Sequence, residues 1–184
     1  MTIRKFSKNK KGGFSLVETL VALTILLVAV VGPISLIGDS LHKIYYAKDE
    51  IVAINLAQEG IEAVRQARDT NKLSGGAWDT GITHTGAGGY YTIDAGNIGG
   101  ALNTFIKQAP ATAPQPVYLD TATGGLYWQT NAGSYATTQF SRIVRIEQIT
   151  AGVENKVTST VTWRTGGDIG TVTVSESIFN WQSL

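Results

Sequence analysis

A long apolar run close to the N-terminus constrains this chain more than any other feature. The run covers residues 14–37, contains 24 residues, and carries a single charge, that of Glu18. At about 1.5 Å per residue a helix of this length spans roughly 35 Å, which exceeds the roughly 30 Å hydrocarbon core of a bilayer. The sequence therefore predicts a helix that inserts into a membrane.

The residues before the run predict its orientation. By the positive-inside rule, cationic residues hold this end of the chain in the cytoplasm, so residues beyond Ile37 would lie outside it. A cleaved secretory signal also begins with basic residues, but its apolar core is shorter and a small-x-small site follows that core. No such site follows this run, and five cationic residues precede it: Arg4, Lys5, Lys8, Lys10 and Lys11.

Glu18 is the residue that a plain membrane anchor does not explain. An unpaired carboxylate inside a bilayer costs several kcal/mol, so an intramembrane glutamate indicates a function. Such a carboxylate needs a cation or hydrogen-bond donors within reach.

The segment Gly13-Phe14-Ser15-Leu16-Val17-Glu18 resembles the cleavage and methylation motif of type IV prepilins and type II secretion pseudopilins. The resemblance implies that a prepilin peptidase removes residues 1–13 as a leader by cutting between Gly13 and Phe14, that Phe14 is then N-methylated, and that Glu18 acts in assembly. The implied partners are other pilin subunits, contacted through the N-terminal helix, prepilin peptidase, an inner-membrane assembly platform and membrane lipid.

Gly32 and Pro33 interrupt the apolar run. Pro33 has no N–H to bond the carbonyl of Ala29, and its ring presses on that carbonyl. We therefore expect a kink or local melting at residues 29–33. Pilins often carry a helix-breaking proline in this region, which implies a role in assembly, while a kink tolerated by a membrane helix without such a role is the alternative.

Beyond Gly38 the pattern becomes amphipathic. Apolar residues recur at spacings of three, four and seven, which is typical of one helical stripe. We predict one nearly continuous helix over residues 14–69, with 14–38 as the transmembrane or filament-core part and 39–69 as the amphipathic part. The stripe consists of Leu41, Ile44, Tyr45, Ile51, Val52, Leu56, Ile61 and Val64.

The sequence of the second half of the chain predicts a loop followed by a sheet. Residues 70–116 are rich in glycine and proline, contain one candidate short strand at 90–93, and correspond to the variable αβ loop of pilins. Residues 117–184 alternate as an antiparallel sheet in which Val157, Val161 and Trp163 share one face. The predicted fold class is α+β and pilin-like, with the N-terminal helix packed on a C-terminal antiparallel sheet and 39–184 forming one globular domain. The expected strands begin near Pro116, Leu126, Phe140, Lys156 and Ile169.

Composition excludes several function classes. The chain has no cysteine, so it has no disulfide, catalytic thiolate or cysteine-bound zinc. After removal of the leader, 10 cationic and 14 acidic residues remain, a net charge of −4, and no nucleic-acid footprint is evident. Neither His42 nor His84 belongs to a recognisable nucleophile–base–acid arrangement in the sequence, so we expect no catalytic residues and no enzyme.

The sequence predicts no cofactor, and it leaves open whether the chain binds calcium. Acidic residues in three loops could supply oxygen ligands, but none has EF-hand spacing, and aspartates that form turns explain them better. Some pseudopilins bind calcium in C-terminal loops. The three groups are Asp94 with Asn97, Asp120 with Thr121 and Thr123, and Asp168.

Together these features predict a structural subunit, a minor pilin or pseudopilin, of a type IV pilus-like filament. The precursor would span the inner membrane once with its N-terminus in the cytoplasm, and the mature protein would lie in an extracytoplasmic filament or at the cell surface. The alternative is a single-pass, membrane-anchored extracytoplasmic binding module that never assembles. The mass of the mature protein separates these alternatives, starting at Phe14 in the first case and near Met1 in the second.

Overall fold

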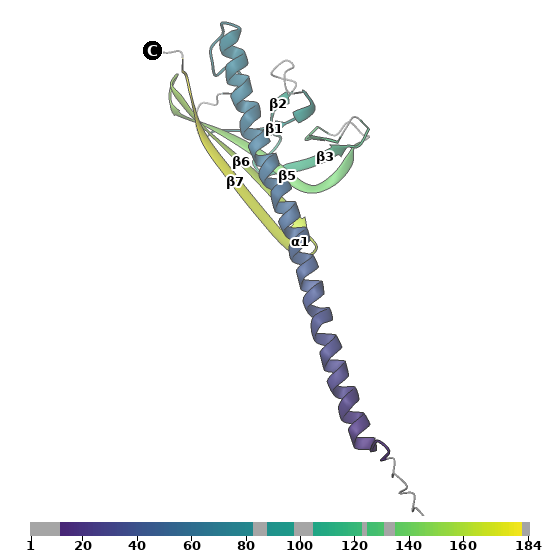
Figure 1. The fold of residues 1–184 in the computed structure, drawn as a ribbon. Coiled ribbons are helices and arrows are strands. Elements are labelled where there is room, and N and C mark those ends of the chain that lie inside the picture. The colour runs from purple at the N-terminus through teal and green to yellow at the C-terminus, as the bar shows by residue number, and fades with distance from the viewer. Residues whose placement is uncertain (1–11, 83–87, 98–104, 123–124, 131–134, 182–184) are drawn as a thin grey trace, which may run out of the picture. The chain divides into compact units, whose positions relative to one another are not determined.

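The computed structural model describes residues 12–82, 88–97, 105–122, 125–130 and 135–181 (Figure 1). The chain divides into two compact units, Met1–Ile44 and Tyr45–Leu184. One helix, α1 (Leu16–Leu73), runs through both. The second unit adds a seven-stranded sheet. The predicted α+β class, with one long N-terminal helix and a C-terminal antiparallel sheet, is confirmed.

The helix ends at Leu73 rather than at the predicted Asp69, because the glycines that cap its C-terminus are Gly75 and Gly76. Gly75 adopts a φ of 74°, in the left-handed region that favours glycine. Its N–H donates to the carbonyl of Lys72 at 3.0 Å, and the N–H of Gly76 donates to the carbonyl of Asn71 at 3.0 Å. These two bonds form a Schellman cap, which satisfies carbonyls that the helix end leaves open.

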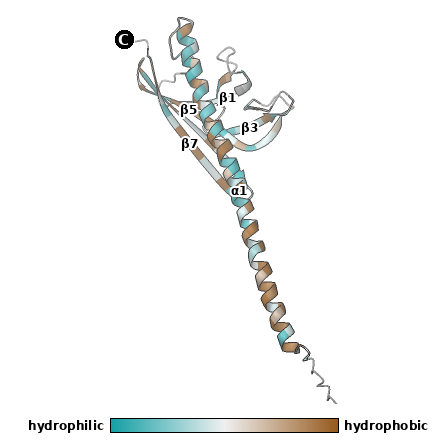
Figure 2. Ribbon diagram, in the orientation of Figure 1, coloured by the Kyte–Doolittle hydropathy of each residue, from teal (hydrophilic) through white to brown (hydrophobic). Residues whose placement is uncertain are grey.

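The first unit is the apolar part of α1, and all of its described residues are exposed. In Figure 2 this part of α1 is mostly brown, the colour of hydrophobic residues, whereas the part of α1 beside the sheet mixes brown and teal. Among the described residues, α1 is the one helix long and apolar enough to cross a membrane. The predicted apolar stripe is wrong for Leu41, Ile44, Tyr45 and Ile51, which are 50–62% exposed. The stripe residues that pack in the core are Val52, Leu56, Ile61 and Val64.

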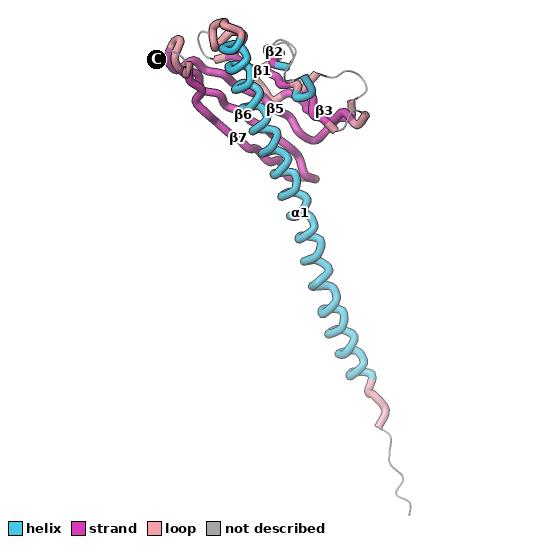
Figure 3. Tube along the Cα trace, turned by 45° about the horizontal axis from the view of Figure 1, so that its top comes forward, coloured by secondary structure: helices cyan, strands magenta, loops and turns pink. Residues whose placement is uncertain are grey.

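The sheet is organised around its longest strand, β5, and all recorded pairings are antiparallel. Strand β6 pairs along one edge of β5 and β7 follows it, while β1 and β3 share the other edge and are extended by β2 and β4 (Figure 3). The strands are β1 (Gly89–Ile93), β2 (Ile106–Gln108), β3 (Gln115–Asp120), β4 (Leu126–Trp128), β5 (Ala136–Thr150), β6 (Glu154–Thr165) and β7 (Asp168–Phe179).

The segment 70–116 contributes more to the sheet than the sequence indicates. The predicted strand at 90–93 is present as β1, but the segment also contains β2 and a short 3-10 helix, η1 (Ala95–Asn97). Strand β1 pairs with β5, at Tyr91 opposite Val144. Strand β2 has three residues, too few for its alternation to be recognised in the sequence.

One face of the sheet packs on α1 within the second unit. The predicted shared face of Val157, Val161 and Trp163 is confirmed, since all three are buried there. Gly60 allows the close approach of helix and sheet, because a Cβ at this position would lie 2.9 Å from Val144 Cγ2 and 2.7 Å from Ser159 Oγ. The helix contributes eight buried residues: Ala53, Leu56, Ala57, Gly60, Ile61, Ala63, Val64 and Ala67.

Trp163 is the largest side chain on this face, and we expect Trp163→Ala to cost about 3–5 kcal/mol of unfolding free energy. Its ring is 3% exposed, lies 5.6 Å from the ring of Tyr46, and packs over Gly170. Urea unfolding of a fragment beginning at Leu41 measures the loss. Trp181→Ala is the control, because Trp181 is 52% exposed. Equal effects of the two substitutions would contradict this assignment.

Candidate functional site

Residues Gly12 to Phe14 precede the helix and are fully accessible. Neither glycine has an atom within 4 Å of the position that a Cβ would take, and the Phe14 side chain is 78% exposed. Because α1 starts only at Leu16, the Gly13–Phe14 peptide bond lies outside helical structure. A protease that requires an extended backbone can reach this bond without unwinding the helix.

Ser15 fixes where the helix begins, a role that the sequence reading missed. Its Oγ accepts a hydrogen bond from the backbone N–H of Glu18 at 3.2 Å, which is the bond made by an N-cap residue. The serine and the glutamate three residues later form the S-x-x-E pattern of a capping box, which was the available sequence signal. This cap is the reason that α1 begins at Leu16 and not at the predicted Phe14.

Glu18 occupies the first turn of α1, where a negative charge interacts favourably with the helix dipole. No described cationic side chain lies within ion-pair distance of its carboxylate. The carboxylate is therefore available to a partner from outside the described part of the chain. Phe14 lies four residues earlier, so an amine there would be about one turn away.

The hydroxyl groups in the apolar part of α1 are bonded to the helix itself. Thr19 Oγ1 and Thr24 Oγ1 each donate to a backbone carbonyl three residues earlier, both at 2.8 Å. Ser35 and Ser40 donate to carbonyls four residues earlier. Because these groups are satisfied locally, residues 14–37 offer a nearly uniform apolar surface on which Glu18 is the single charge.

Gly32 and Pro33 lie inside α1, which is helical on both sides of them. Local melting at residues 29–33 is therefore not observed in the isolated chain. A kink in the helix, and any part that it plays in assembly, stay predictions. Among the described residues, a Cβ on Gly32 would meet nothing within 4 Å, so no contact in that part of the chain requires a glycine there.

A second cluster of polar residues is buried in the domain, centred on Arg142 of β5. The side chain is fully buried. Its Nη1 donates to the carbonyl of Leu56 at 2.9 Å and to Glu59 Oε1 at 2.6 Å, and its Nη2 donates to the carbonyl of Ile93 at 2.7 Å. Its Nε donates to Gln129 Oε1 at 3.0 Å. One guanidinium thus joins the helix, β1 and the segment after β4.

Asp94 lies directly after β1 and holds the segment after β4, which Arg142 also contacts. Its carboxylate accepts hydrogen bonds from Lys107 Nζ, from Thr130 Oγ1, and from the N–H groups of Gln129 and Thr130, at 2.6–2.8 Å. Burial by itself would raise the pKa of Asp94, but these hydrogen bonds outweigh it and hold the pKa below its ordinary value. The aspartate is therefore an ionised structural anchor of the loop.

The residues considered for catalysis or metal binding do not come together in the part of the chain that is described. That part holds no group of three or more His, Asp or Glu residues able to bind a metal. His42 is exposed on α1, and His84 lies outside the described residues. Asp120 accepts a bond from the N–H of Ala122 at 2.8 Å, the contact of an aspartate that forms a turn. Calcium binding stays a prediction.

Comparison with known proteins identifies the N-terminal segment. The profile of the prokaryotic N-terminal methylation motif matches residues 8–32. No curated protein and no solved structure gives a significant match to the chain. The matched residues include the Gly13–Phe14 bond, the Ser15 cap, Glu18 and the first half of the exposed apolar helix. The N-terminal segment therefore carries the motif that marks type IV prepilin-like proteins.

Proposed function

We propose that this prepilin-like chain is a minor pilin or pseudopilin, a structural and non-enzymatic subunit of a type IV pilus-like filament. One observation carries the proposal. The methylation motif at residues 8–32 lies on a helix whose residues 16–45 are all exposed, with Glu18 as the one charge within the apolar run. An apolar surface of this extent requires lipid before assembly and other helices after it.

The proposed maturation follows from the order of the residues. Prepilin peptidase cuts the accessible Gly13–Phe14 bond on the cytoplasmic face of the inner membrane, and the new Phe14 amine is N-methylated. An N-methylated amine remains protonated at neutral pH, so it supplies the cation that Glu18 lacks within the described chain. Pairing of this amine with Glu18 of an adjacent subunit sets the register of one helix on the next.

The apolar segment supports a filament core better than a plain anchor. An anchor needs only a sufficient length of apolar residues, and a glutamate within it adds a cost. A packed bundle of helices gives the carboxylate a partner and covers the exposed apolar side chains. Pro33 is proposed to let α1 bend at residues 29–33 as it passes from the bilayer into the filament.

Replacement of the carboxylate tests assembly separately from insertion. Glu18→Gln keeps the size of the side chain and removes its charge, so membrane insertion and cleavage at Gly13 should persist. Incorporation into filaments should fall at least about tenfold, because close charge pairs are worth roughly 1.5 kcal/mol or more and 1.4 kcal/mol is a factor of ten. Immunoblots of sheared filaments and of membranes, normalised to total protein, measure this ratio.

Glu50→Gln is the matched control. Glu50 is an exposed glutamate on the same helix but outside the apolar run, so its loss should leave incorporation within about twofold of wild type. If Glu18→Gln enters filaments as efficiently as wild type, the carboxylate does not register subunits and the filament role assigned to it is wrong.

A further inference from the structure

The face of the sheet that points away from α1 carries exposed apolar residues at both ends of β7. The side chains in between are hydroxyls: Thr171, Thr173, Ser175 and Ser177. At one end lies Ile169, 66% exposed, and at the other lies Phe179, 49% exposed. The ten steps along the strand from Ile169 to Phe179 span about 33 Å at roughly 3.3 Å per residue. The two apolar ends therefore cannot meet within one chain.

The Phe179 end forms a patch that we call the aromatic end, made of Ile149, Val153, Phe179 and Trp181. These four residues are 46–52% exposed. The backbone brings them together, because the N–H of Asn180 donates to the carbonyl of Val153 at 2.9 Å. Trp78, which follows the end of α1, donates its Nε1–H to the carbonyl of Gly152 at 3.2 Å. The aromatic end thus lies beside the C-terminal end of α1 (Figure 1).

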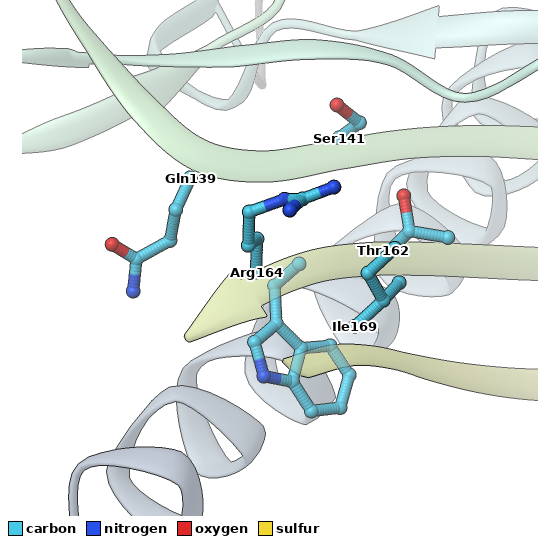
Figure 4. A pocket seen from close by; sticks show the side chains of 6 residues that line it. Gln139, Ser141, Thr162, Arg164 and Ile169 are labelled. Atoms are coloured by element: carbon cyan, nitrogen blue, oxygen red, sulfur yellow. The ribbon is translucent and has the colours of Figure 1, made fainter. Parts of the chain in front are cut away.

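The opposite end of the same face contains a pocket of about 180 Å³, which we call the pocket end. Thr165 lies next to it and donates from its Oγ1 to Asp49 Oδ2 at 2.6 Å, so this end lies beside an earlier part of α1. Figure 4 shows five of the lining side chains labelled around the pocket. The lining residues are Gln139, Ser141, Thr162, Trp163, Arg164 and Ile169.

The size and lining of the pocket suit a single protein side chain. Pockets that bind small molecules measure about 300–1,000 Å³, so this pocket is small for a ligand. Ile169 gives it an apolar wall, and Arg164 gives it an exposed guanidinium, which is attracted to the face of an aromatic ring. An exposed aromatic side chain is the chemistry that this combination recognises, and the aromatic end offers two.

We propose that the aromatic end of one copy docks on the pocket end of the next copy, as a head-to-tail contact along the filament. This inference rests on the proposed function in the form in which copies of this chain follow one another in the filament, with their helices running in the same direction. Parallel packing repeats each domain along the helix direction, so the end beside the C-terminus of α1 faces the end beside Asp49 of the following copy. A head-to-tail contact between unlike patches builds an open filament when its rotation does not close a ring.

Cysteine cross-linking in assembled filaments tests the contact, since the chain has no native cysteine. The variant carries Gln139→Cys in the pocket lining and Trp181→Cys at the aromatic end, and leaves Phe179 and Ile169 in place. These two positions lie at opposite ends of the sheet, far beyond the Cα separation of about 7 Å that a disulfide allows. Any bond between them must therefore join two chains.

Oxidation of sheared filaments, or treatment with a short bis-maleimide, should give a ladder of dimers, trimers and longer species. At least about tenfold more cross-linked species are expected from the double variant than from either single variant. Gln139→Cys combined with Leu126→Cys is the matched control, because Leu126 is an exposed apolar residue of β4 outside the aromatic end, and it should give no ladder.

Two other cross-linking results would overturn the proposed contact. Dimers formed by Trp181→Cys alone would show contact between like ends and would overturn the proposal. Filaments that contain the double variant but give no ladder would also overturn it, while leaving the filament function intact. If the cysteine-free wild type is absent from filaments, the proposed function itself fails, and the head-to-tail contact fails with it.

Discussion

The Gly13→Val variant is expected to accumulate as full-length precursor in the inner membrane, with no detectable mature protein. The residue before the cleaved bond must enter the peptidase in an extended conformation close to the enzyme backbone, which glycine allows and a β-branched side chain obstructs. Within the chain itself the substitution is harmless, because a Cβ on Gly13 would meet no atom within 4 Å. Any loss of maturation therefore reports on the peptidase and not on folding.

Gly12→Val is the matched control for this prediction. Gly12 has the same open surroundings and lies one residue further from the cleaved bond. Mass spectrometry of the membrane fraction should find mature Gly12→Val protein and only precursor for Gly13→Val. Normal maturation of Gly13→Val would show that the bond after this glycine is not the one that is cut.

The second large effect is expected in the domain, where Arg142→Ala should lower the free energy of unfolding by about 3–5 kcal/mol, as removal of one partner of a buried ion pair does. The substitution leaves Glu59, which is 27% exposed, without its cation. It also leaves the buried carbonyls of Leu56 and Ile93 without these donors. Urea unfolding of the fragment beginning at Leu41 measures the change.

Arg145→Ala is the control for Arg142, because Arg145 lies on the same strand but is 38% exposed and pairs with Glu147 at 3.4 Å. Its loss should cost at most about 1 kcal/mol. A double-mutant cycle of Arg142→Ala with Glu59→Gln should give a coupling energy above about 1 kcal/mol. Arg142→Ala with the stability of wild type would mean that the guanidinium does not hold the helix, β1 and the segment after β4 together.

Local patterns in the sequence are enough to predict the helix and the longer strands. The alternation of Val157, Val161 and Trp163 predicts which face of β6 is buried, because the side chains of a strand alternate strictly. The alternation does not predict the register shift in the pairing of β5 with β6 between Gln148 and Thr150, because such an irregularity interrupts the regular ladder.

Long-range partners could not be predicted. The pairing of β1 with β5 joins residues far apart in the chain, and nothing in Tyr90-Tyr91-Thr92-Ile93 specifies the partner strand. The buried position of Arg142 did have a local signal, because it lies between Phe140 and Val144 on the buried face of its strand. Its partners Leu56, Glu59 and Ile93 are known only once the helix is placed on the sheet.

The N-terminal site, unlike the long-range contacts of the domain, could be predicted from the sequence, because its functional residues lie within six consecutive positions. Gly13, Phe14 and Glu18 were identified from the sequence, and the motif profile covers all three. The role of Ser15 as helix cap was missed, although the spacing of Ser15 and Glu18 carries the signal for it. Ser15 and Glu18 are three residues apart, so the first turn of the helix by itself sets the position of one relative to the other.

In the proposed function, this chain is cut after Gly13 and enters a filament through the helix that begins beyond the cut. Intact-mass analysis and N-terminal sequencing of the wild-type protein recovered from sheared extracellular filaments test both steps. We expect a protein that begins at N-methylated Phe14 and lacks residues 1–13. A protein that begins at or near Met1, or one found in membranes and never in filaments, would contradict the proposed function.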